Sequence, residues 1–168
     1  MTLAELNAAD RAEFVRMLGR IFEDSPWVAE RAWERRPFAS IDDLHAAMSA
    51  VVEAASEGEQ LQLLRAHPDL GTRARMSDAS SGEQRGAGLD RLTPDEFARL
   101  QRLNTQYRDA FGFPFLFAVK GSTKEDVLRA LDARVGRPRR EEFAEALSQV
   151  YRIARFRLEE LQRGETAR

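Results

Sequence analysis

The residues best suited to chemistry lie in one stretch, 67–90, between two segments with helical patterns. It opens with His67-Pro68-Asp69-Leu70-Gly71 and, after a polar bridge, continues with Ser80-Ser81-Gly82-Glu83-Gln84. His67 is one of only two histidines in the chain, and four of its ten glycines fall in this stretch. Catalytic residues are often found in loops held by a rigid scaffold. We therefore expect the functional site here.

His67 precedes a proline, which disfavours helical geometry at the residue before it, so a helix should end at about His67. An imidazole with the ordinary pKa of about 6.5 can donate or accept a proton near neutral pH, and a helix carboxy terminus favours its protonated form. The alternative is a surface histidine at a helix end, which on spacing alone is the commoner case. The other histidine, His45, lies on a regular helical pattern and is predicted to face solvent.

Glu83 has two interpretations that the sequence leaves open. Ser80-x-x-Glu83 is a capping box, in which the glutamate only stabilises the start of a helix. The glutamate can also be catalytic, and both roles are compatible, because the N–H groups at a helix start suit an anionic ligand. Gly82 would let backbone approach such a ligand closely.

Arg157 is unusual because it lies on the apolar stripe of the last predicted helix, with Val150, Ala154 and Leu161 at helical spacing. Its guanidinium either extends along the edge of the stripe to solvent or points inward to an acceptor. A substrate carboxylate would be a natural bidentate partner for an inward guanidinium.

Composition excludes several classes of function. The net charge of -2 gives no general attraction to nucleic acid or to an anionic membrane, and the basic run 134–140 is followed at once by Glu141 and Glu142, which indicates a solvated helix start. There is no cysteine, and two histidines without an HExxH pattern make a zinc site improbable. The longest apolar stretch, 111–119, is too short to span a membrane. A cytoplasmic protein is expected.

Hydrophobic spacing predicts a single all-α domain over residues 1–168, with about seven or eight helices and no sheet. The predicted helix starts are Asn7, Ser25-Pro26, Ser40, Ser56, Thr93-Pro94, the segment 121–125 and Pro138. Residues 113–119 are apolar without a helical period, and we expect them to form a buried extended segment.

Several motifs occur together and in order along nearly the whole chain. They are His67-Pro68-Asp69-Leu70, Ser80-x-x-Glu83-Gln84-x-x-Ala87-Gly88-Leu89, Asn104-x-x-Tyr107, Phe111-Gly112-Phe113-Pro114-Phe115 and Val119-Lys120-Gly121. As a set they resemble the 2-oxo-4-hydroxy-4-carboxy-5-ureidoimidazoline (OHCU) decarboxylase family of urate catabolism. One departure is that Ser81-Gly82 stand where the family often has bulkier or charged residues.

The resemblance implies an all-helical, homodimeric enzyme that uses no metal or other cofactor and converts OHCU to (S)-allantoin. It implies that His67 is the catalytic histidine and that Glu83 works with it. The residues that it assigns to substrate binding are Pro68, Ser80, Ser81, Gly82, Glu83, Gln84, Phe115, Leu116, Phe117, Ala118, Val119 and Arg157. We expect backbone N–H groups of 116–118, with Gln84, to hold the ureido and ring amides of the substrate.

Two other functions remain open at this point. One is a helical interaction module without enzymatic activity, with Phe111 to Phe117 as an exposed patch that binds a partner. The other is a related decarboxylase that acts on a different ureido or purine-derived acid. Phenylalanines that wall a small polar pocket containing His67, Glu83 and Arg157 would favour an enzyme. Phenylalanines that form an exposed hydrophobic surface away from His67 would favour the interaction module.

Overall fold

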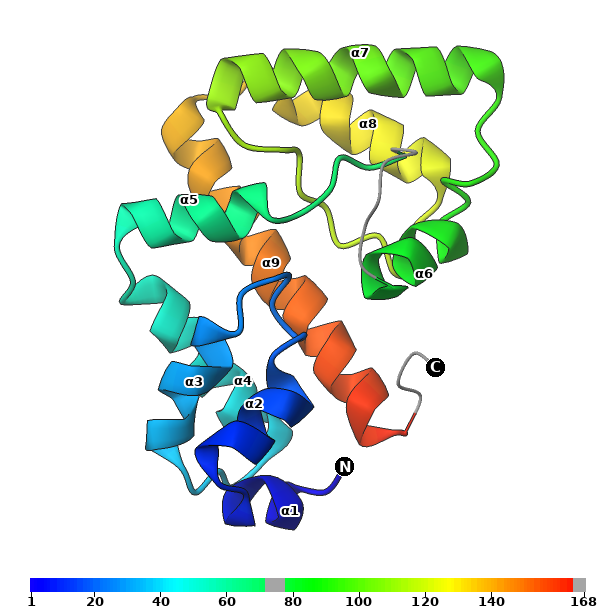
Figure 1. The fold of residues 1–168 in the computed structure, drawn as a ribbon. Helices are drawn as coiled ribbons and strands as arrows, with labels where there is room; N and C mark the ends of the chain where they lie inside the picture. Colours follow the sequence, from blue (N-terminus) through cyan, green and yellow to red (C-terminus); the bar gives the residue numbers. More distant parts are fainter. Residues whose placement is uncertain (72–77, 165–168) are drawn as a thin grey trace. The chain divides into compact units, whose positions relative to one another are not determined.

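A computed structural model describes residues 1–71 and 78–164, and every regular element in this part of the chain is helical (Figure 1). The predicted all-α class is confirmed, and residues 1–71 and 78–164 contain no sheet. Nine α-helices and one 3-10 helix are described, where the sequence predicts seven or eight helices. The chain divides into two compact units, residues 1–66 with the segment from Tyr151 onward, and residues 67–150. That all 168 residues form one domain stays a prediction.

The first unit contains five short to medium α-helices before the start of the stretch that carries the candidate site. They are α1 (Leu3–Ala8), α2 (Arg11–Leu18), α3 (Trp27–Ala32), α4 (Ile41–Glu53) and α5 (Glu57–Arg65), with the 3-10 helix η1 (Trp33–Arg35) after α3. Leu44, Met48, Val51 and Val52, which recur at helical spacing along α4, are all buried and form its apolar stripe. The side chains of Ser40 and Ser56 cap α4 and α5 as predicted.

The amino-terminal helix prediction is wrong in one respect. Asn7 does not cap a helix. Thr2 and Asp10 do so instead, for two separate helices. The Asn7 amide pairs with the backbone of Phe38, accepting from its N–H at 2.8 Å and donating to its carbonyl at 2.9 Å. A side chain that is suited to capping is equally suited to bridging two loops, and only the fold distinguishes these uses.

Two further side chains in the first unit differ from expectation. Ser25 does not cap α3. Its hydroxyl donates to the carbonyl of Glu23 at 2.8 Å. His45 is half-buried rather than solvent-facing, and its Nε2 lies 2.8 Å from the carbonyl oxygen of Tyr151. His45 therefore has a structural partner within its own unit.

The second unit contains α6 (Asp78–Gly86), α7 (Pro94–Phe111), α8 (Lys124–Arg134) and the first half of α9 (Arg139–Gln162). The starts of α7 and α8 are capping boxes formed by Thr93 with Glu96 and by Thr123 with Asp126. Gly112 ends α7 in the left-handed conformation, with φ of 80°, as a glycine at this position predicts. Helices α7 and α8 lie side by side (Figure 1).

The segment between α7 and α8 forms no helix and is buried at 113–116 and at 118–119, which confirms the predicted burial of this apolar run. Aromatic rings pack against it: the Tyr107 ring lies 4.4 Å from that of Phe111 and 5.4 Å from that of Phe115, measured between centroids. Phe117 is half-buried. No large hydrophobic side chain is exposed in the described ranges, so the exposed patch that an interaction module would need is not present there.

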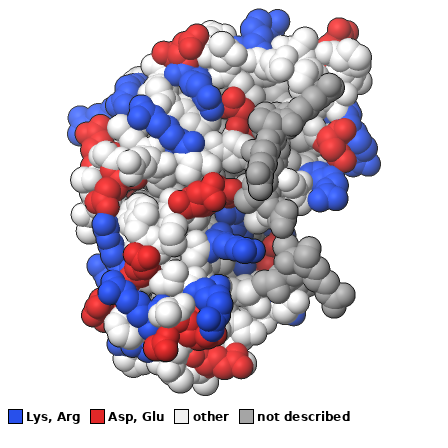
Figure 2. Space-filling model, viewed as in Figure 1, with Lys and Arg blue, Asp and Glu red and all other residues white. Residues whose placement is uncertain are grey.

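The surface is polar and mixed in charge. On the face shown in Figure 2, acidic and basic side chains are intermixed. Among the helices of residues 1–71 and 78–164, none is both long and apolar enough to cross a membrane.

Candidate active site

The predicted site residues are divided between the two units. His67, Pro68, Ser80 to Gln84 and Phe115 to Val119 all belong to the second unit, while Arg157 belongs to the first. The polar bridge of the 67–90 stretch lies partly outside the described residues, at positions 72–77. The site is therefore described within the second unit, and Arg157 is described by itself.

His67 begins a turn that follows α5, which we call the histidine turn (67–71). The His67 side chain is buried, with 6% of its surface exposed. The turn ends at Gly71, whose φ of +72° lies in the left-handed region that favours glycine. A Cβ atom at this position would overlap Cδ2 of Leu100 on α7. The histidine is thus a buried group at the start of a turn that packs closely on α7, and not a surface residue at a helix end.

Three consecutive residues of the histidine turn are each held by a different side chain. Arg108 Nη2 lies 2.8 Å from the Asp69 carboxylate, and Asn104 Nδ2 donates to the Leu70 carbonyl at 2.9 Å. Gly71 N–H donates to Gln84 Oε1 at 2.8 Å. Two of these side chains come from α7 and one comes from α6. The turn that carries His67 is therefore fixed from two helices of its unit.

Helix α6 changes the interpretation of Glu83. The helix begins at Asp78, so Ser80 and Glu83 lie inside it and the predicted capping box at its start is wrong. Ser80 and Gln84 are buried, Ser81 and Glu83 are half-buried, and Gly82 is exposed. Glu83 is therefore not the third residue of a capping box at the start of α6. Its neighbour Gln84 supplies the bond to the histidine turn, which links the helix of Glu83 directly to the turn of His67.

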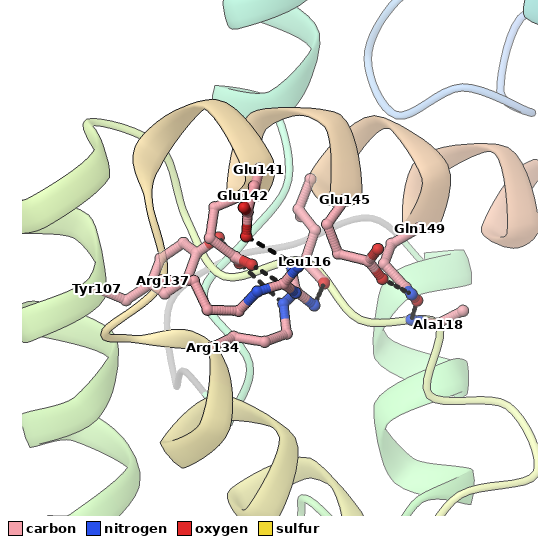
Figure 3. A network of polar contacts seen from close by, with 9 residues as sticks. All are labelled: Tyr107, Leu116, Ala118, Arg134, Arg137, Glu141, Glu142, Glu145 and Gln149. Atoms are coloured by element: carbon pink, nitrogen blue, oxygen red, sulfur yellow. Dashed lines mark hydrogen bonds and ion pairs between the residues drawn. The ribbon is translucent and has the colours of Figure 1, made fainter.

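The segment 115–119, which we call the wall, is held by side chains that sequence reasoning missed (Figure 3). Arg134 Nη1 donates to the Leu116 carbonyl at 2.7 Å, and its guanidinium lies 4.6 Å from the Phe115 ring centroid. Ala118 N–H donates to Gln149 Oε1 at 2.9 Å. The expectation that this N–H binds substrate therefore needs correction, because a protein acceptor already occupies it.

Glu142 is the centre of the polar network in Figure 3 and is completely buried. Its Oε1 accepts from Tyr107 Oη at 2.6 Å and from Arg134 Nε at 2.8 Å. Its Oε2 lies 3.2 Å from Arg137 Nη1, an ion pair without hydrogen-bond geometry. The sequence predicts a solvated helix start here, and for Arg134 and Glu142 that is wrong. The spacing of the two residues was a usable clue. Arg134 ends α8 and Glu142 lies in the first turn of α9, so the two side chains can meet across the short turn between these helices.

Arg157 points inward. Its side chain is 6% exposed, and its Nη2 lies 2.8 Å from the carboxylate of Glu23, which is 2% exposed. Of the two alternatives that the sequence left open, the guanidinium therefore points inward and does not extend to solvent. A buried carboxylate as the partner of Arg157 was not foreseen.

A hollow of about 790 Å³ opens beside the histidine turn, between residues 69–71 and the outer face of α7. None of the predicted catalytic or substrate-binding residues lines it. It is therefore not the polar pocket, walled by phenylalanines and containing His67, Glu83 and Arg157, that would favour an enzyme.

Comparison with known proteins identifies the family. The OHCU decarboxylase family model matches residues 7–159. A 2-oxo-4-hydroxy-4-carboxy-5-ureidoimidazoline decarboxylase of Halalkalicoccus jeotgali is 50% identical over 161 residues, which are 96% of this chain and 92% of that protein. The human protein described as a putative decarboxylase of the same name is 38% identical, over 100% of this chain and 99% of its own length.

Solved structures agree with this assignment. The crystal structure of an (S)-allantoin synthase superposes with a TM-score of 0.77 at 37% identity, over 96% of this chain and 54% of that longer chain. An OHCU decarboxylase crystallised in the presence of (S)-allantoin has a TM-score of 0.70 at 19% identity, over 91% of this chain and 98% of its own, and shows the shared fold. The chain belongs to the OHCU decarboxylase family, and the protein is a carboxy-lyase.

Replacement of Gly71 by alanine should destabilise the protein, because the new Cβ atom meets Leu100 and the backbone conformation disfavours a side chain. We expect a loss of roughly 2–4 kcal/mol in the free energy of unfolding, measured by urea denaturation. Gly58→Ala is the matched control. It lies inside α5 with only ordinary contacts and should gain about 0.5–1 kcal/mol. Equal effects of the two substitutions would contradict this account of the turn.

The free energy of unfolding should fall at alkaline pH, because folding raises the pKa of both tyrosines. Burial, followed by the hydrogen bond to Glu142, raises the pKa of Tyr107 above its ordinary value of about 10, and burial with Glu53 does the same for Tyr151. A raised folded-state pKa means that this stabilisation is complete below about pH 10 and is lost as pH rises toward the folded value. Because the chain has only two tyrosines, ultraviolet tyrosinate absorbance reports both. Tyr107→Phe should reduce the loss of stability above pH 10, and tyrosinate formation at the usual pH in folded protein would refute the prediction.

Proposed function

We propose that this protein decarboxylates OHCU to (S)-allantoin in urate degradation, with His67 as proton donor and Glu83 as its partner. Membership of the family supports the reaction. The observation that carries the site assignment is the hydrogen bond from Gly71 N–H to Gln84 Oε1, 2.8 Å long. It joins the turn that begins at His67 to the helix that carries Glu83.

The reaction sets two demands on the protein. When the carbon–carbon bond to the carboxylate breaks, CO2 leaves and its electron pair stays on the ring carbon, from which it must be delocalised into the adjoining carbonyl or imine. Hydrogen-bond donors stabilise that developing charge. One proton must then reach the ring carbon from one face, since water delivers protons to both faces and gives a racemic product.

His67 suits the second demand. Its side chain is buried, and the turn that bears it is fixed by α6 and α7, so the imidazole can deliver a proton from one direction. A carboxylate beside an imidazolium favours the protonated ring, which is the form that a donor needs. Glu83 supplies this carboxylate in our proposal. Its position on α6, next to the Gln84 side chain that accepts from Gly71 N–H, supports the assignment.

Substrate binding is assigned to the remaining residues of the two segments and to Arg157. Pro68, Ser80, Ser81, Gly82 and Gln84 flank the two catalytic groups along the chain, and the wall contributes the half-buried Phe117 ring. The Leu116 carbonyl and the Ala118 N–H are used by Arg134 and Gln149, so their part is to shape the wall. An anionic substrate group at Arg157 would share the guanidinium, which has five N–H donors, with Glu23.

Two further properties remain proposals that rest on the resemblance. We propose that the protein is a homodimer and that it acts in the cytoplasm. Light scattering on the purified protein tests the first, and a monomer at micromolar concentration would exclude it.

The decisive test of the site uses both histidines of the chain. His67→Asn should lower kcat for freshly generated OHCU by about 100- to 10,000-fold, because the positioned proton donor is lost. His45→Gln is the matched control and should retain activity, since His45 contacts the Tyr151 carbonyl outside the second unit. The readout is circular dichroism of the allantoin formed, which reports rate and handedness together. Wild-type rates with His67→Asn would refute the assignment.

Glu83→Gln keeps the shape of the side chain and removes its charge. We expect lost activity with an unchanged melting temperature. A wild-type protein that fails to accelerate OHCU decarboxylation, yet releases CO2 from another ureido acid, would instead favour the related decarboxylase.

A further inference from the structure

The side chain of Asn104 has an unusual hydrogen-bond pattern. It is 6% exposed, and its Nδ2 donates to the Leu70 carbonyl, which is 34 residues earlier in the chain. Its Oδ1 is buried and has no hydrogen-bond partner within residues 1–71 and 78–164. An unpaired buried carbonyl opposes folding about as much as one hydrogen bond favours it. The amide therefore contributes little net stability, and its main structural effect is to hold the Leu70 carbonyl.

That carbonyl lies within the histidine turn, where few degrees of freedom remain. Pro68 has a fixed φ, Leu70 is buried, and Gly71 is held by Gln84. The third contact, between Asp69 and Arg108, joins side chains that are 33% and 51% exposed, and an ion pair of this kind contributes little. The bond from Asn104 is the fully buried one among the three contacts to residues 69–71.

We propose that Asn104 is a positioning residue, which fixes the His67 imidazole for proton delivery by holding the histidine turn. This inference rests on the proposed catalytic role of His67. Asn104 acts through the backbone of the turn. Misplacement of a reacting group by about 1 Å can lower a rate by about 100-fold, so a single lost bond here has a large kinetic effect and a small thermodynamic one.

The test variant is Asn104→Leu, which keeps the branched shape of the side chain with slightly larger terminal groups and removes the donor together with the unpaired oxygen. Thr105→Ala is the matched control, since Thr105 is the next residue on α7 and is exposed. Asn104→Ala is a second variant without added bulk, for use if the leucine does not fit. We expect kcat to fall by about 10- to 100-fold, KM to stay unchanged and the melting temperature to stay within about 5 °C.

Nuclear magnetic resonance provides a direct readout of the imidazole. The chain has two histidines, so each ring gives its own signals. In Asn104→Leu the His67 ring signals should shift while those of His45 stay in place. In Thr105→Ala neither histidine should change, and kcat should equal that of the wild type.

The outcomes separate this inference from the proposed function. An unchanged kcat with unshifted His67 signals overturns the role of Asn104, as does a raised KM at constant kcat, which would indicate ground-state binding. A rate loss that only follows a loss of folded protein overturns it as well. If His67→Asn retains activity, the proposed function of His67 fails first, and the signals of His67 in Asn104→Leu still test whether Asn104 holds the turn.

Discussion

The buried carboxylate of Glu142 is the interaction on which the second unit depends most. It lies on α9, accepts a hydrogen bond from Tyr107 of α7 and pairs with Arg134 of α8. Three helices thus meet at one charge that is completely excluded from solvent. A buried charge without its partners is costly, so the helices can pack only in the arrangement that brings both partners to it. Arg134 extends this constraint to the wall through the Leu116 carbonyl.

Helix α7 connects this network to the histidine turn. Tyr107 faces the buried carboxylate, while Asn104 and Arg108, one helical turn apart, contact residues 70 and 69. Helix α7 therefore positions both the polar network that supports the wall and the histidine turn. The capping box at Thr93 and the glycine at 112 define where this element begins and ends, and both were predictable because they depend only on local sequence.

What the sequence could not predict depends on contacts between distant residues. The starts of α4, α5 and α7, the apolar stripes and the burial of the run 113–119 follow from periodicity and caps, and the ordered motifs point to the family. The same local rules failed at Ser80 and Glu83, where a good capping pattern lies inside a helix that starts earlier. They also failed at Glu142, since a charged residue near a helix start is normally solvated, and at Ala118, whose N–H is satisfied by Gln149 from 31 positions away.

The fit of Gly71 against Leu100 has a consequence for how this turn can change by substitution. Two separate penalties oppose any larger residue at position 71, one from the atoms of Leu100 and one from the positive φ. A smaller residue at 100 would act as a compensating substitution for the first penalty and leave the second in full. The two positions therefore do not restrict each other equally. Position 100 has some freedom while 71 is glycine, but no change at 100 makes position 71 free to vary.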